Sequence, residues 1–107
     1  MEPEAVAKAA ELAETILTTK HSHAFAKAVE KFVHVLATVP DYPAATFSDD
    51  AVATLLGLSE QVIEQIEQRV NTEQDGASVQ QEIVSAVYDI RRVLENIALW
   101  RRHYRGV

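Results

Sequence analysis

An apolar residue recurs every seven positions near the carboxyl end of the chain, and this spacing constrains the fold more than any other feature. The repeat consists of Ile83, Ile90, Ile97 and Tyr104. Two further apolar columns accompany it, one of Ala86, Val93 and Trp100 and one of Val87 and Leu94. Because an α-helix turns once every 3.6 residues, these columns form one broad apolar stripe along a long helix. The pattern predicts a helix over about residues 78–105.

The breadth of this stripe decides between two helical architectures. Two columns suit a two-stranded coiled coil, whereas three columns reach two neighbouring helices, as in a helical bundle. A helix of about 28 residues is about 42 Å long, whereas we expect earlier helices of about 25 Å. Apolar surface that extends beyond its own neighbours requires cover from another chain. The sequence therefore predicts a homodimer, and its predicted interface includes Leu94, Ile97, Trp100 and Tyr104.

The composition favours one all-α domain. The chain has 107 residues, of which 48% are hydrophobic, and it contains only three glycines and three prolines. A chain of this length fits a single domain that buries about two-thirds of its unfolded surface. No segment alternates apolar and polar residues for long, so strands are not expected. We predict one helical-bundle domain over residues 1–107, with four or five helices.

The amino-terminal third carries an apolar stripe that shifts sideways near residues 18–22. The shift indicates either a break, with Thr19 or Ser22 capping a second helix, or one long helix whose contacts rotate around it. We expect the break. Pro40 and Pro43 then end the second helix and hold the following loop extended, because proline disfavours α geometry in the residue before it. Aromatic residues of this loop are expected to anchor it to the body.

Residues 48–70 have the pattern of two helices joined by a tight turn. Gly57 permits the positive φ of a turn, and Ser59 is placed to cap the helix that follows. Apolar side chains on both sides of the glycine supply a packing face: Val52, Ala53, Leu56, Leu58, Ile63 and Ile66. This segment, from Ser48 to Val70, resembles the helix-turn-helix of bacterial repressors over about a fifth of the chain. No resemblance to a named family covers the whole chain.

The resemblance implies that the second helix of this segment enters the major groove of DNA and reads base edges. The side chains in the reading positions are Ser59, Gln61, Gln65 and Gln68. The charge of the segment opposes this role, because affinity for duplex DNA comes largely from lysine and arginine. Five acidic residues lie here with Arg69 as the single base. Two helices packed around a glycine also occur as plain architecture, so a DNA-binding transcriptional regulator is the alternative function.

The net charge of −6 is unevenly distributed along the chain. Residues 1–90 hold fifteen acidic and five basic residues, whereas residues 91–107 hold five arginines and one acid, Glu95. Arginines beside aromatic residues suit nucleic acid or an anionic membrane. The candidate anion contacts are Arg91, Arg101, Arg102 and Arg105. We favour the simpler interpretation that these cations stabilise a helix end and pair with the acidic body, because that body repels polyanions.

The sequence gives little support for catalysis or cofactor binding. It contains no cysteine, which excludes disulfides, thiolate metal sites and thiol catalysis. His21 and His23 are the candidate metal ligands, but metal sites in bundles use Glu and His pairs three residues apart on two helices, and no such pair occurs. No glycine-rich loop is present to hold a phosphate group. We expect no enzyme activity, no cofactor and no metal.

The amino terminus lacks the basic and apolar regions of a secretory signal, and no apolar run reaches the ~20 residues that span a bilayer. These features predict a cytoplasmic protein without a membrane partner. Taken together, the patterns favour a non-catalytic interaction module. It would be a helical bundle that dimerises through its last helix and presents an acidic surface to a protein partner, with nucleic acid disfavoured.

Overall fold

Four α-helices account for most of the chain. The computed structural model describes residues 3–73 and 75–105, without the side chains of Tyr104 and Arg105. The helices are α1 Glu4–Thr18, α2 Ser22–Ala37, α3 Asp49–Asn71 and α4 Ala77–Arg105. Two short 3-10 helices, η1 Val39–Asp41 and η2 Ala44–Thr46, lie between α2 and α3. The predicted all-α bundle with a long carboxyl-terminal helix is confirmed.

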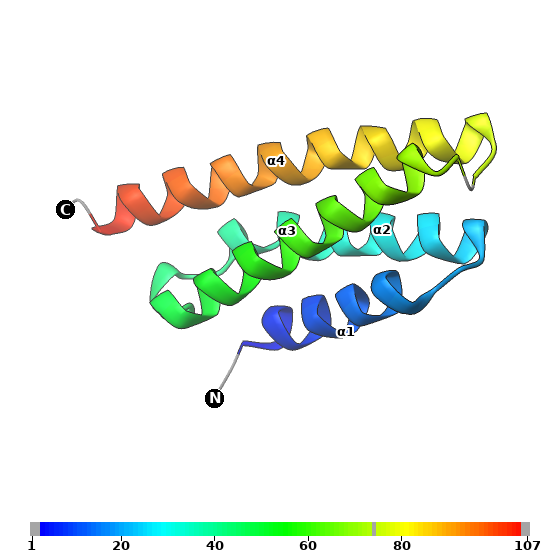
Figure 1. The fold of residues 1–107 in the computed structure, drawn as a ribbon. Coiled ribbons are helices and arrows are strands. Elements are labelled where there is room, and N and C mark those ends of the chain that lie inside the picture. The colour runs from blue at the N-terminus through cyan, green and yellow to red at the C-terminus, as the bar shows by residue number, and fades with distance from the viewer. Residues whose placement is uncertain (1–2, 74, 106–107) are drawn as a thin grey trace.

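The helices form two antiparallel hairpins that stack on each other (Figure 1). In this stack α1 packs mainly against α2 and α3, and α4 packs mainly against the same two helices. The molecule measures 47 × 24 × 17 Å. With its 29 residues, α4 is about 43 Å long and so runs almost the full length of the body.

The sideways shift of the apolar stripe marks a break between two helices, as predicted. The buried face of α1 is formed by Ala5, Val6, Ala9, Ala13 and Ile16, and that of α2 by Phe25, Ala28, Val29, Phe32 and Leu36. The capping prediction is wrong, because His21 caps α2 by accepting a hydrogen bond at Nδ1 from the Ala24 amide at 3.5 Å. Ser22 lies inside the helix, where its hydroxyl donates to Asp75 instead.

The loop after α2 is turned rather than extended, so that part of the prediction is wrong. Pro40 lies in the first turn of η1, where the missing N–H of proline breaks no helical hydrogen bond. The Tyr42 amide donates to the Val39 carbonyl at 3.1 Å and closes the turn. The expected anchoring by aromatic residues holds for Phe47, which is buried and packs edge-on against Trp100 with ring centroids 5.9 Å apart. The loop thereby covers the carboxyl-terminal part of α4.

One continuous helix of 23 residues runs through Gly57, so the predicted turn is wrong. Gly57 has no positive φ, and Ser59 caps nothing, since its buried hydroxyl donates to the Leu55 carbonyl at 2.7 Å. The physical reason is the apolar stripe, which continues across the glycine without a shift in phase through Ala51, Leu55, Val62 and Ile66. Burial of that stripe outweighs the cost of about 1 kcal/mol for glycine within a helix. The two-helix geometry expected from Ser48 to Val70 does not form.

Replacing Gly57 with alanine distinguishes the continuous helix from a turn. A Cβ built at this position meets nothing within 4 Å, and the backbone is helical. We therefore expect Gly57→Ala to raise the free energy of unfolding by about 0.5–1 kcal/mol, because alanine loses less backbone entropy on folding. Chemical denaturation measures this change. If Gly57 had the left-handed conformation of a turn, alanine would instead lower the free energy of unfolding. Such a decrease would contradict the continuous helix.

Candidate interaction surface

The isoleucine ladder of α4 is buried within the single chain. Ile83, Ile90 and Ile97 are each 1% exposed or less. This cover comes from α2, from α3, whose full length the sequence did not reveal, and from the loop that carries Phe47. Because α3 is unbroken, it is about 35 Å long rather than two short helices. The loop that carries Phe47 packs over the rest of the stripe. Within the described residues, the three isoleucines of this ladder therefore leave no apolar surface for a second chain to cover.

This burial overturns most of the predicted dimer interface. Ile97 and Trp100 lie in the core, at 1% and 8% exposure, and so present little surface to a partner. Leu94 is partly buried and packs against the same core. The side chain of Tyr104 lies outside the described residues. An interface on α4 would therefore have to use the opposite side of the helix.

A second row of residues on α4, here called the outer stripe, faces solvent. It consists of Val84, Tyr88, Arg91, Glu95, Ala98, Leu99 and Arg102, all of them exposed. At 100° per residue these positions lie within about 100° of one another around the helix. The large apolar members are 37% exposed at Val84, 65% at Tyr88 and 58% at Leu99. Thus α4 has one apolar face inside the bundle and a mixed apolar and charged face outside it.

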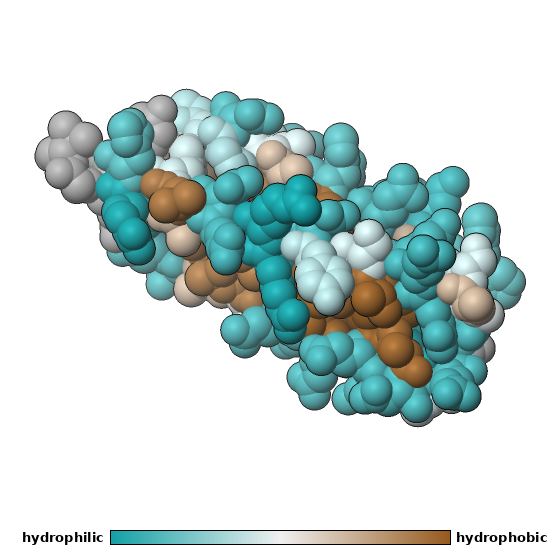
Figure 2. Space-filling model, turned by 90° about the horizontal axis from the view of Figure 1, so that it is seen from above, coloured by the Kyte–Doolittle hydropathy of each residue, from teal (hydrophilic) through white to brown (hydrophobic). Residues whose placement is uncertain are grey.

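A shallow groove between α3 and α4 continues the outer stripe sideways. It has a volume of about 240 Å³, and its apolar lining comes from Ile66, Val70, Val84 and Val87, with Glu67 and Arg91 among its polar residues. Figure 2 looks down on the side where α4 is uppermost and shows apolar surface exposed among hydrophilic side chains. The outer stripe and this groove together form one partly apolar surface at the same side of the bundle.

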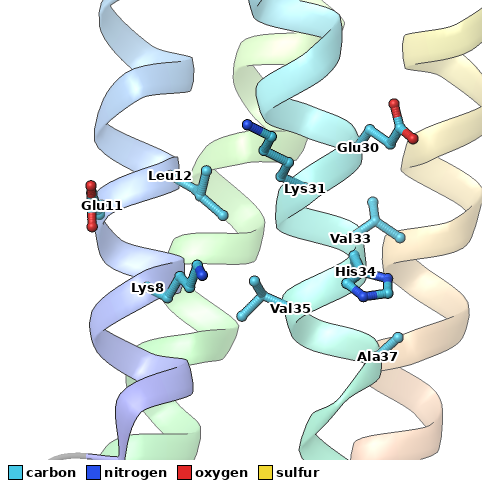
Figure 3. Close-up of a pocket in the computed structure, with 9 residues that line it drawn as sticks. All are labelled: Lys8, Glu11, Leu12, Glu30, Lys31, Val33, His34, Val35 and Ala37. Atoms are coloured by element: carbon cyan, nitrogen blue, oxygen red, sulfur yellow. The ribbon is translucent and has the colours of Figure 1, made fainter.

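A larger hollow lies elsewhere, between α1 and α2. It has a volume of about 750 Å³. Leu12 and Val35 point into the space between the two helices, as do Lys8 and Lys31 at different heights, while Glu11 and Glu30 point away from it (Figure 3). Their polar ends point in different directions rather than towards one point. Binding sites for small molecules instead use polar groups that converge, so this hollow offers weaker grounds for a site than the surface on α4.

One of the candidate anion contacts, Arg101, is part of the fold. Its guanidinium donates to the Phe47 carbonyl at 2.7 Å and forms an ion pair with Asp49 in the first turn of α3. The interpretation that the basic end pairs with the acidic body of the same chain is confirmed for this residue. Arg91 and Arg102 are exposed, and the side chain of Arg105 lies outside the described residues.

The structure does not bring the candidate DNA-reading residues into one basic patch. Ser59 is fully buried, Gln65 is half-buried, and Gln61 and Gln68 are exposed. The contact between Arg101 and Asp49 places the basic end of α4 at the amino-terminal end of α3. Gln61 lies twelve residues further along α3, which is about 18 Å along the helix axis. Arg101 therefore lies far from Gln61, and from Gln65 and Gln68 beyond it.

A buried ion pair between Arg69 and Asp75 joins the two turns at one end of the bundle. Asp75 lies in the turn from α3 to α4, and its carboxylate accepts from Arg69 Nε at 3.0 Å and from an Arg69 terminal nitrogen at 2.6 Å. The same guanidinium donates to the Thr19 and Lys20 carbonyls at 3.2 and 3.3 Å, which lie in the turn from α1 to α2. It also lies 4.1 Å from the centre of the Phe25 ring. All four helices meet at this pair.

The apolar periodicity of α3, rather than the composition of the chain, indicates a buried charge at Arg69. Arg69 follows Val62 and Ile66 on the buried stripe of α3, so its position within the periodicity is a core position. An arginine on a buried stripe requires a charged partner. The partner could not be identified, because Asp75 lies in a polar connection among other acidic residues.

The pKa of Asp75 is held below its usual value of 3.8 mainly by the hydrogen bonds from Arg69, with the Ser22 hydroxyl also lowering it and burial opposing the shift. A carboxylate with a lowered folded pKa stabilises the fold above its unfolded pKa, and this contribution is lost as the pH falls through the folded pKa. We therefore expect the free energy of unfolding to decrease on acidification below about pH 4. Asp75→Asn should be less stable at neutral pH, with the difference shrinking towards low pH. The control Asp41→Asn, at an exposed carboxylate, should not show this convergence.

Among residues 3–73 and 75–105, no group of three or more histidine or acidic side chains is arranged to hold a metal ion. None of the helices in that part of the chain combines the length and apolarity needed to cross a bilayer. Comparison of the chain with protein-family models, curated proteins and solved structures found no match. The function of this chain is therefore inferred from its own surfaces.

Proposed function

We propose that this chain is a non-catalytic interaction module that binds another protein through the outer stripe of α4. The observation that carries the proposal is the second face of α4, which exposes Val84, Tyr88 and Leu99 although the bundle buries the isoleucine ladder completely. Apolar side chains grouped on one exposed face, beside an apolar groove, are typical of contact surfaces. Tyrosine and arginine, both present in the stripe, are the residue types enriched at the energetic centres of interfaces.

The surroundings of the stripe favour a protein partner over a polyanion. Glu60, Glu64 and Glu67 are exposed on α3, and their spacing puts them one above another on one side of the helix. Glu67 belongs to the groove beside the outer stripe. A negative column at the edge of the surface repels nucleic acid and attracts basic groups of a partner protein. As part of the same proposal, the module acts in the cytoplasm, which the absence of cysteine fits.

Site-specific photo-crosslinking in the native host tests this proposal. A photoreactive phenylalanine analogue at position 88 should give a discrete adduct with a protein, because Tyr88 is the most exposed of the large apolar side chains in the stripe. The same analogue at position 14, an exposed site on α1, is the matched control and should give no discrete adduct. Mass spectrometry identifies the adduct. Equal labelling at both positions, or none at position 88, would remove the outer stripe as a contact surface.

A further inference from the structure

We propose that the protein bound by the outer stripe is a second copy of this chain, with the two α4 helices packed antiparallel. The inference rests on the contact function proposed above and adds the identity and orientation of the partner. It is carried by two features of the stripe, namely the spacing of its residues and the order of its charges.

The spacing is that of a helix-pairing seam. Positions 84, 88, 91, 95, 98 and 102 alternate steps of four and three residues, as do the core positions of paired helices. The seam residues are Val84, Tyr88, Arg91, Glu95, Ala98 and Arg102, all on the exposed side of α4. The seam extends over 19 residues, from position 84 to position 102, and these two ends are about 27 Å apart along the helix. This is a second seam, separate from the isoleucine ladder that the bundle already covers.

The charges at the centre of the seam select the antiparallel orientation. In a parallel pair, Arg91 would face its own counterpart, and so would Glu95. In an antiparallel pair with the two-fold axis beside residue 93, each Arg91 faces Glu95 of the second copy, and the symmetry forms this pair twice. Among the described residues, the side chains of Arg91 and Glu95 form no hydrogen bond or ion pair. Both charges are thus available to a partner.

The same register matches the apolar and acidic groups beside the centre. It places Tyr88 against Ala98 and Leu99 of the second copy, which covers the most exposed ring of the stripe. Val84 then lies opposite Arg102 of the second copy, whose stem covers the valine while its guanidinium approaches the acidic Glu67 in the groove. One two-fold arrangement therefore satisfies the apolar and the charged members of the stripe together.

Like charges near the axis keep the association weak. Arg92 of both copies lies on the flank of the seam close to the two-fold axis, and their repulsion opposes docking. Asp89 and Glu95 lie one turn away from Arg92 on the same helix and reduce that repulsion. Since the seam centre is charged and the apolar members are few, we expect a dissociation constant in the range of about 10–100 µM.

Reciprocal charge reversal tests the register. In a sample of wild-type chain at about 100 µM, a dissociation constant of about 10–100 µM places roughly half to four-fifths of the chains in dimers, and sedimentation should show this fraction. Arg91→Glu alone places two acids against each other, and Glu95→Arg alone places two arginines, so each variant should dimerise at least about tenfold more weakly. An equimolar mixture of the two single variants should regain association, because every facing pair is then opposite in sign. In each single variant, positions 91 and 95 carry charges of the same sign, so they cannot form an ion pair within one helix. Restored association therefore reports contact between chains.

A control variant and a test of folding complete the experiment. Lys31→Glu, an exposed charge reversal on α2, should leave the dimer unchanged, and circular dichroism should show all variants folded. A monomeric wild type at about 100 µM would overturn the inference, as would a mixture of variants that stays monomeric. A position 88 adduct with a different protein would leave the interaction function intact and remove the second copy as its partner. Absence of any adduct at position 88 would remove both.

Discussion

Replacing Arg69 with alanine is expected to lower the free energy of unfolding by about 3–5 kcal/mol, because it leaves a buried carboxylate without its partner. The Arg69 side chain holds both oxygens of Asp75 and two backbone carbonyls of the turn between α1 and α2. A domain of this size is stable by about 5–15 kcal/mol in total, so the loss is a large part of its stability. Thermal denaturation should show a melting temperature lower by at least about 12 °C.

The matched control removes an arginine from the surface. Arg92 is exposed on α4, and Arg92→Ala should change the free energy of unfolding by no more than about 0.5 kcal/mol. The difference between the two variants then measures what burial and the four hydrogen bonds of Arg69 contribute. Similar melting temperatures for both variants would show that the pair with Asp75 does not hold the end of the bundle together.

Two neighbouring residues of α4 should respond in opposite ways to the same truncation. Ile97 is 1% exposed and Leu99 is 58% exposed, although they lie two positions apart on one helix. Ile97→Ala is expected to cost about 2–5 kcal/mol, since it removes buried apolar surface and leaves a cavity. Leu99→Ala should cost less than about 0.5 kcal/mol in dilute solution. Urea denaturation at low protein concentration measures both without a contribution from association.

The pair of truncations decides which face of α4 belongs to the core. A large loss of stability at Leu99, or a small one at Ile97, would exchange the two faces and restore the isoleucine ladder as the exposed surface. The dependence on concentration adds a second criterion. Loss of stability at Ile97 should persist on dilution, because it arises within one subunit rather than at an interface.

The helices of this chain could be predicted where the apolar pattern is compatible with only one structure. Three apolar columns at helical spacing specify α4, and the lateral shift of the stripe near residue 20 specifies the break between α1 and α2. The predicted turn at Gly57 is wrong because the conformational preference of one glycine is weaker than the apolar stripe around it. That stripe keeps its phase from Leu55 to Val62, and burial along 23 residues outweighs one glycine.

The functional surface was harder to predict, because exposure depends on partners that lie far away in the sequence. The isoleucine ladder has the apolar composition of a protein contact surface, but the full length of α3 and the loop around Phe47 cover it. The outer stripe has mixed charges and scattered apolar residues, so it resembles an ordinary solvated face until the core face is known. Likewise, the partner of Arg69 is determined by which two turns meet at the end of the bundle.

We propose that the outer stripe of α4 binds a second copy of this chain, and residue-resolved amide spectra recorded over a dilution series test that proposal most directly. On concentration to about 100 µM, the resonances of Tyr88, Arg91, Glu95 and Leu99 should shift together along one binding curve. Those of Lys8 and Glu11, beside the hollow between α1 and α2, should stay constant. Shifts confined to α1 and α2, or constant resonances throughout the outer stripe, would contradict it.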